Sequence, residues 1–145
     1  MDDVRKLFID TSAWIAYSAK DDKNHSKIVH LFSKYLSNEI EIYTSNDIVD
    51  ETVTRLAYDV GWYKARSFIE YFQIAVMKKM IIQVWTDEQI QYEAFSLLEK
   101  YKDHKFSLTD ATSVVILRRF KIDLILTLDS DFRKIGISSL PELLS

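Results

Sequence analysis

Residues 7–12 read Leu-Phe-Ile-Asp-Thr-Ser, a short apolar run that ends in an aspartate and two hydroxyl residues. Such a run predicts a buried strand, and the polar residues after it predict a turn into a helix. Strands buried on both faces are typical of parallel sheets that carry helices on each side. Ligands of open sheets of this kind bind beyond the carboxyl ends of the strands, so Asp10 is the first candidate for a functional side chain.

The rest of the chain alternates short apolar runs with longer amphipathic segments. Apolar residues at helical spacing predict helices over residues 25–36, 48–57, 62–76 and 88–101, and from 107 onward. Further strands are predicted at residues 40–43, 80–85 and 124–128, with a last short strand or turn after Gly136. This order predicts a single α/β domain over residues 1–145, with a central, mostly parallel sheet flanked by helices on both faces.

The composition excludes several classes of function. The chain has 145 residues, of which 48% are hydrophobic and 28% charged, as expected of one globular domain. It has no cysteine, which excludes disulfides, a thiol nucleophile and a thiolate zinc site. Its two glycines, Gly61 and Gly136, are too far apart to form a phosphate-binding loop, a dinucleotide-binding motif or a nucleophile elbow.

Location follows from what the sequence lacks. No apolar run approaches the length of a membrane span, so we expect no membrane association. Asp2 and Asp3 occupy positions where a signal peptide carries basic residues. Together with the absence of cysteine, this predicts a cytoplasmic protein.

Four acids occupy the positions where this fold places its ligand site. Asp10 and Asp129 follow predicted strands, while Glu51 and Asp110 lie near the starts of predicted helices. If the four segments meet at one edge of the sheet, the carboxylates repel one another and raise one another's pKa. A hard divalent cation such as Mg²⁺ or Mn²⁺ resolves that repulsion, because it prefers oxygen ligands.

The segments around these acids resemble the PIN-domain family, and within it the VapC-type toxin ribonucleases. The resemblance rests on four motifs in the family's order: residues 8–12 (FIDTS), 45–52 (SNDIVDET), 107–111 (SLTDA) and 126–132 (LTLDSDF). It implies that the acidic site consists of Asp10, Glu51, Asp110 and Asp129, with Asp10 and Asp110 as the most direct metal ligands. It also implies that Ser12 and Thr127 orient the carboxylates by hydrogen bonds, and it leaves open whether Asp131 shares the role of Asp129.

The family resemblance further implies an activity and partners. The expected activity is that of an Mg²⁺- or Mn²⁺-dependent endoribonuclease that hydrolyses RNA with a metal-activated water. The expected partners are an RNA substrate, a second copy in a homodimer and a small antitoxin protein that occupies the acidic crevice.

Each acid also has an ordinary structural explanation. These are helix capping by Asp10, a capping box of Asp110 with Ser107, an ion pair of Glu51 with Arg55 one helical turn later, and a polar turn at Asp129.

Other functions remain open at this point. Within the family, the chain would be a housekeeping nuclease of RNA processing or a catalytically silent binding module. Residues 129–131 (DSD) also suggest a phosphoaspartate enzyme, but their position near the C-terminal end disfavours it. The aromatic residues between 62 and 72 are expected in the core or at a dimer contact. The basic pairs at 118–119 and 133–134 would contact phosphate or simply face solvent.

Overall fold

The computed structural model describes residues 4–36 and 39–141. Asp2 and Asp3, on which the argument against a signal peptide rests, lie outside the described residues. The elements in chain order are β1 (Lys6–Ile9), α1 (Thr11–Ser18), α2 (His25–Leu36), β2 (Glu41–Ser45), α3 (Asn46–Arg55), a π-helical turn η1 (Leu56–Val60), α4 (Trp62–Met77), β3 (Ile82–Val84), α5 (Glu88–Lys100), α6 (Leu108–Arg119), β4 (Leu124–Leu126), α7 (Asp131–Lys134) and β5 (Ser139–Leu140).

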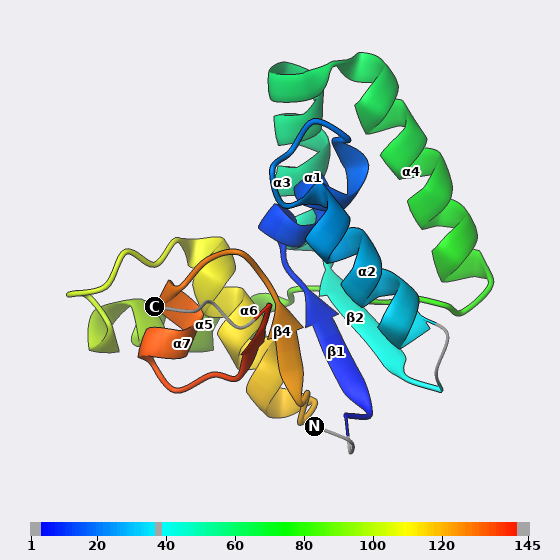
Figure 1. Ribbon diagram of the computed structural model, residues 1–145. Helices are drawn as coiled ribbons and strands as arrows, with labels where there is room; N and C mark the ends of the chain where they lie inside the picture. The colour runs from blue at the N-terminus through cyan, green and yellow to red at the C-terminus, as the bar shows by residue number, and fades with distance from the viewer. Residues whose placement is uncertain (1–3, 37–38, 142–145) are drawn as a thin grey trace.

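The five strands form one parallel sheet in the order β3-β2-β1-β4-β5. Strand β1 lies at the centre, where Phe8 is paired with Tyr43 of β2 and Ile125 of β4 (Figure 1). Phe8 and Ile125 are fully buried, as expected of strands that helices cover on both faces. The predicted α/β fold with a parallel central sheet is therefore confirmed.

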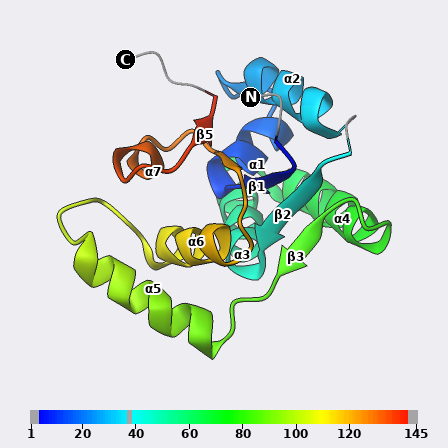
Figure 2. The same cartoon turned by 90° about the horizontal axis from the view of Figure 1, so that it is seen from below.

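The helices form a layer on each side of the sheet. Helices α2 and α4 lie on one side, and α5 and α6 lie on the other (Figure 2). Trp14 of α1 anchors the first layer, because its ring lies 5.3 Å from that of Phe32 in α2 and 5.4 Å from that of Phe68 in α4. No helix in the described parts of the chain combines the length and apolar character that crossing a membrane requires.

The aromatic segment at the start of α4 divides between core and surface. Phe68 and Phe72 are buried against Trp14, whereas the side chain of Tyr63 is 81% exposed. The predicted core role is thus confirmed for the two phenylalanines, and Tyr63 lies outside the core. For the exposed ring of Tyr63, the dimer contact stays a prediction.

Two local predictions differ from the structure. The strand predicted at residues 80–85 is limited to Ile82–Val84, since β3 lies at the edge of the sheet and pairs only with β2. The short helix α7 was not predicted, because four residues are too few to reveal a helical period.

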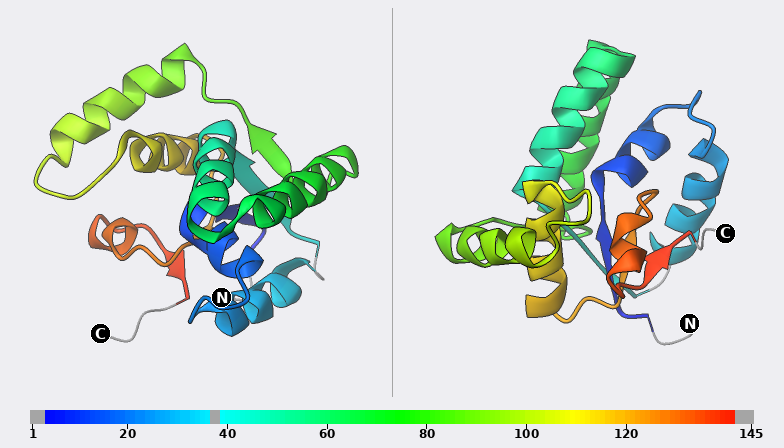
Figure 3. Two further views of the ribbon diagram at one scale, coloured as in Figure 1. Left: turned by 90° about the horizontal axis from the view of Figure 1, so that it is seen from above. Right: turned by 90° about the vertical axis from the view of Figure 1, so that its left-hand side faces the viewer.

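The order of the strands defines where a ligand site belongs. From the central β1 the chain moves outward to β2 and β3, and it then crosses back to add β4 and β5 on the other side. Such a reversal opens a crevice at the carboxyl ends of the two central neighbours, β1 and β4. Seen from above in Figure 3, helices α1, α3 and α6 lie around these carboxyl ends.

Candidate functional site

Asp10 follows β1 directly and is 5% exposed. It occupies the N-cap position of α1, but its side chain makes no capping hydrogen bond. Instead, the hydroxyl of Thr127 donates to Asp10 Oδ2 over 2.7 Å. The capping explanation for this carboxyl group therefore does not hold, and its closest partner comes from the other central strand.

Thr127 and Ser12 join the ends of the two central strands. Thr127 Oγ1 also accepts from the backbone N–H of Asp129 over 3.0 Å, so one hydroxyl group contacts two of the predicted acids. Ser12 Oγ accepts from the backbone N–H of Leu128 over 2.9 Å and lies 3.3 Å from Thr127 Oγ1. Thr127 thus orients Asp10 as predicted, while Ser12 acts on the loop after β4.

Asp110 lies in the first turn of α6 and is held there by a capping box. Its backbone N–H donates to Ser107 Oγ over 3.0 Å, and Asp110 Oδ2 accepts from the backbone N–H of Ser107 over 3.0 Å. The predicted structural role is therefore present. It occupies Oδ2 of this half-buried carboxyl group, and no hydrogen bond to Oδ1 is seen within residues 4–36 and 39–141.

Glu51 lies on α3, which begins at the end of β2 because Ser45 caps it. Ser45 Oγ accepts from the backbone N–H of Ile48 over 3.2 Å. The carboxyl group of Glu51 is half-buried, and within residues 4–36 and 39–141 no ion pair joins it to Arg55. The ion-pair explanation for Glu51 is therefore wrong.

Asp129 lies in the turn after β4 and is half-buried. Its Oδ1 accepts from the backbone N–H of Asp131 over 2.9 Å, which is the polar turn predicted for this position. Asp131 itself is paired with Lys134, whose Nζ lies 3.3 Å from Asp131 Oδ1. This ion pair distinguishes Asp131 from Asp129, which has no such partner among the described residues.

The charges of Asp110 and Glu51 act on Asp10, and those of Asp129 and Glu51 act on Asp110. We call these four residues the acidic cluster: Asp10, Glu51, Asp110 and Asp129. Burial raises the pKa of Asp10 to about 7; the Thr127 hydrogen bond opposes this rise, and the charges of Asp110 and Glu51 add to it. Burial also raises the pKa of Asp110, and the charges of Asp129 and Glu51 contribute. The pKa of Asp129 is raised by burial and by the charge of Asp131.

The donor set of the acidic cluster suits a hard cation. All its donors are carboxylate oxygens, which Mg²⁺ and Mn²⁺ prefer, and like charges in a partly buried site are stabilised by a cation. In residues 4–36 and 39–141, however, no three such side chains already surround one point at ligand distance. The cluster fits an ion that keeps several waters, as Mg²⁺ commonly does, better than one that needs a closed protein cage.

A further acid near the cluster was not predicted. Asp47 lies one helical turn before Glu51 on α3, and its Oδ2 accepts from the hydroxyl of Thr112 on α6 over 3.2 Å. The contact connects the helices that carry Glu51 and Asp110. The four-residue spacing of Asp47 and Glu51 was the available signal, since it places both side chains on one helix face.

The arginines in the last turns of α6 and α7 contact other residues of the protein. Arg119 forms an ion pair with Glu93 of α5, and Arg118 hydrogen-bonds to the hydroxyl of Tyr101. Arg133 donates to Ser139 Oγ over 3.2 Å. Arg118 and Arg119 lie in the last turn of α6 and Arg133 in that of α7, so the predicted role as helix-end charges is confirmed, and phosphate binding stays a prediction.

Comparisons with known proteins concern the family and the fold. The sequence model of the PIN domain family matches residues 7–138. The 23S rRNA-specific endonuclease VapC20 of Mycobacterium tuberculosis, strains CDC 1551 / Oshkosh and H37Rv, is 26% identical over 131 residues, which are 90% of this chain and 94% of that protein.

Solved structures share the fold over nearly the whole chain. The crystal structure of M. tuberculosis VapC20, described as a Sarcin-Ricin loop cleaving toxin, has a TM-score of 0.79 at 24% identity and covers 90% of this chain and 95% of that one. VapBC2 from Rickettsia felis, bound to a DNA fragment from their promoter, has a TM-score of 0.64 at 11% identity, with 92% and 96% covered. FitAcB from Neisseria gonorrhoeae has a TM-score of 0.63 at 14% identity, with 92% and 95% covered.

Proposed function

The chain belongs to the PIN domain family, and on that premise we propose that it is an endoribonuclease and the toxin of a toxin–antitoxin pair. The observation that carries the proposal is the acidic cluster, which gathers carboxylates from four separate segments at the carboxyl edge of a parallel sheet. The similarity to VapC20, named as a 23S rRNA-specific endonuclease, supports RNA as the substrate.

The activity would depend on Mg²⁺ or Mn²⁺, held by Asp10 and Asp110 with Glu51 and Asp129 completing the site. When bound, such an ion neutralises charge on the phosphate and lowers the pKa of water. Asp10 is the ligand that the protein fixes most firmly, because Thr127 holds one of its oxygens and the surrounding core excludes water. Asp110 is fixed at its backbone and one oxygen by the capping box.

The proposed partners follow the complexes named for similar structures, VapBC2 and FitAcB. A small antitoxin protein would cover the acidic crevice and keep the nuclease inactive, and two copies of the chain would form a homodimer. The proposed site of action on RNA is the cytoplasm, as expected from the sequence.

A housekeeping nuclease of RNA processing would use the same acidic cluster. A gene for a small protein beside this one, whose product binds the chain and stops cleavage, would favour the toxin. A catalytically silent binding module would lack both cleavage and tight binding of divalent cations.

The proposal is tested by incubating the protein with a mixed RNA pool and Mg²⁺ or Mn²⁺. We expect the protein to cleave RNA and a chelator to stop this cleavage. Asp10→Asn and Asp110→Asn should each abolish cleavage, because each substitution removes a charged ligand. Asp50→Asn, at an exposed position on the same helix as Glu51, is the matched control and should cleave normally. Cleavage that resists the chelator, or normal turnover by both ligand variants, would contradict the proposal.

A further inference from the structure

A pocket of about 260 Å³ lies beside the acidic cluster and is not used by the chemistry proposed above. Its walls come from the first turn of α3, the segment that joins β3 to α5, and the first turn of α6. The polar side chains that line it include Asp47, Thr86, Asp87, Gln91 and Thr109. The volume is just below the ~300–1,000 Å³ of sites for drug-sized ligands, and so suits one small ring system.

The pocket and the acidic cluster lie along the same edge of the sheet. Asp47 and Glu51 share a face of α3, and Thr109 directly precedes Asp110 in α6. Because all strands are parallel, the carboxyl ends of β2 and β3 continue the edge formed by β1 and β4. An RNA strand with a phosphate at the acidic cluster would therefore place a neighbouring nucleotide at the pocket.

The pocket offers mainly hydrogen-bond acceptors. Asp47 Oδ2 accepts from Thr112, and the described residues provide no partner for Oδ1. Asp87 Oδ1 accepts from the backbone N–H of Ile90 over 2.9 Å. Ionised carboxyl groups only accept, so a matching ligand presents adjacent N–H donors.

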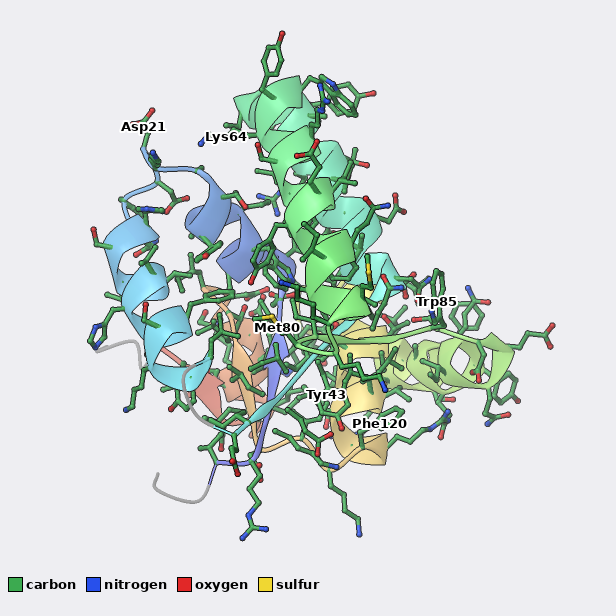
Figure 4. All side chains as sticks on the ribbon, turned by 90° about the vertical axis from the view of Figure 1, so that its right-hand side faces the viewer. Asp21, Tyr43, Lys64, Met80, Trp85 and Phe120 are labelled. Carbon is green, nitrogen blue, oxygen red and sulfur yellow. The ribbon has the colours of Figure 1, made fainter. Side chains whose placement is uncertain are left out.

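Two further observations concern the side chains at and next to this pocket. The hydroxyl oxygen of Thr86 is buried and has no hydrogen-bond partner in the described parts of the chain, although buried polar atoms are rarely left unpaired. Trp85, which directly precedes it, is 67% exposed and lies beside the start of α5 (Figure 4). Trp85 thus presents an exposed indole one residue before Thr86, and proteins stack unpaired bases on exposed aromatic side chains of this kind.

We propose that this pocket, with the exposed Trp85 one residue before its lining residue Thr86, binds the nucleobase next to the cleaved phosphodiester bond and selects guanine. Guanine presents a ring N–H and an amino group side by side, and both would donate to the carboxyl group of Asp47. Uracil has a single N–H between two carbonyl oxygens, which would face carboxylates. The inference rests on the proposed ribonuclease function for the position of the RNA, but not for the binding of the base.

The first test compares cleavage of short RNAs that are identical except for guanine or uracil beside the scissile bond. We expect the unmodified protein to prefer guanine roughly tenfold or more, the range of a bidentate contact to a base, and Asp47→Asn to lose that preference. Asp50→Asn, exposed on the same helix, should keep it. Equal cleavage of both RNAs by the unmodified protein, or an unchanged preference in Asp47→Asn, would overturn the inference and leave the ribonuclease proposal intact.

The second test measures binding of guanosine and uridine monophosphates by calorimetry, without RNA cleavage. We expect the guanine nucleotide to bind more tightly, and Asp47→Asn and Trp85→Leu each to weaken it. If no RNA is cleaved under any condition, this result still supports the pocket while the ribonuclease proposal fails. Equal affinity for both nucleotides, or an Asp47→Asn variant whose only defect is weaker Mg²⁺ binding, would overturn the inference.

Discussion

At the scale of single residues, the ionised form of Asp10 is strongly disfavoured by burial and by neighbouring negative charges. It is almost fully buried, it faces the charges of Asp110 and Glu51, and its single side-chain partner among the described residues is the Thr127 hydroxyl. A buried carboxyl group without a cation is stabilised by taking up a proton. Protons and a divalent cation therefore compete for this position.

The raised pKa of Asp10 predicts how stability depends on pH in the absence of metal. The pKa of Asp10 is about 7 in the folded protein, whereas the unfolded chain releases this proton at 3.8, the ordinary value of an aspartate. The favourable contribution is thus complete below the lower value and is lost as the pH rises through this window. In chelator at about pH 8, Asp10→Asn should exceed the unmodified protein in free energy of unfolding by on the order of 3 kcal/mol.

Urea denaturation followed by circular dichroism measures this difference. The advantage of Asp10→Asn should shrink towards about pH 4, because both side chains are then uncharged when folded. Excess Mg²⁺ at the higher pH should stabilise the unmodified protein alone. If Asp10→Asn were less stable than the unmodified protein at high pH in chelator, the buried carboxylate of Asp10 would not be destabilising, which would contradict the prediction.

Thr127 should set the pH at which the nuclease becomes active. Its hydrogen bond lowers the pKa of Asp10, so Thr127→Val should raise that pKa and move the rise of kcat/KM to higher pH. Thr127→Ser keeps the hydroxyl group and should retain the original profile. The pH profile of Mg²⁺-dependent cleavage measures this shift, and identical profiles for Val and Ser variants would show that the hydroxyl group does not act on Asp10.

At the scale of elements, the first turn of α6 combines a structural and a functional role. Ser107 and Asp110 form a complete capping box, and the same carboxyl group belongs to the acidic cluster. The spacing of these two residues predicted the capping box, and the family resemblance implied that Asp110 belongs to the acidic site. Their coexistence was not predictable, because it depends on which oxygen of Asp110 the cap occupies.

Removing the cap should weaken α6 and loosen Asp110. Ser107→Ala should lower the free energy of unfolding by about 1 kcal/mol, the usual value of an N-cap hydroxyl, and should reduce cleavage by mispositioning Asp110. Ser33→Ala, at an exposed position within α2, is the matched control and should lose neither. Thermal unfolding measures the first effect and the rate of RNA cleavage measures the second. Full activity in a destabilised Ser107→Ala variant would show that the cap does not position Asp110 for cleavage.

At the scale of the whole molecule, the parallel sheet explains why segments far apart in sequence meet. The order of strands and helices could be predicted from apolar spacing, and the positions of Asp10 and Asp129 followed from the rule for strand ends. The contact of Asp47 with Thr112 and the pocket beside it could not, since they depend on how α3 and α6 pack. The edge strand β3 was overestimated because its apolar run continues beyond its pairing with β2.

The net charge acquires a physical explanation at this scale. The chain has 19 basic and 22 acidic residues, a balance of −3 that by itself argues against a nucleic-acid partner. Setting aside the four carboxylates of the acidic cluster leaves 22 − 4 = 18 acids against 19 basic residues. A bound divalent cation would offset the negative charge of the acidic cluster itself, where phosphate has to enter.

The central claim is that carboxylates from four segments form one site for a divalent cation, and calorimetric titration of the full chain with Mn²⁺ measures it most directly. We expect saturable binding by the unmodified protein and by Asp50→Asn, and at least roughly tenfold weaker binding by Asp10→Asn, Asp110→Asn and Glu51→Gln. Circular dichroism of each variant verifies that it is folded. Equal Mn²⁺ affinity in the unmodified protein and all three folded ligand variants would contradict the claim.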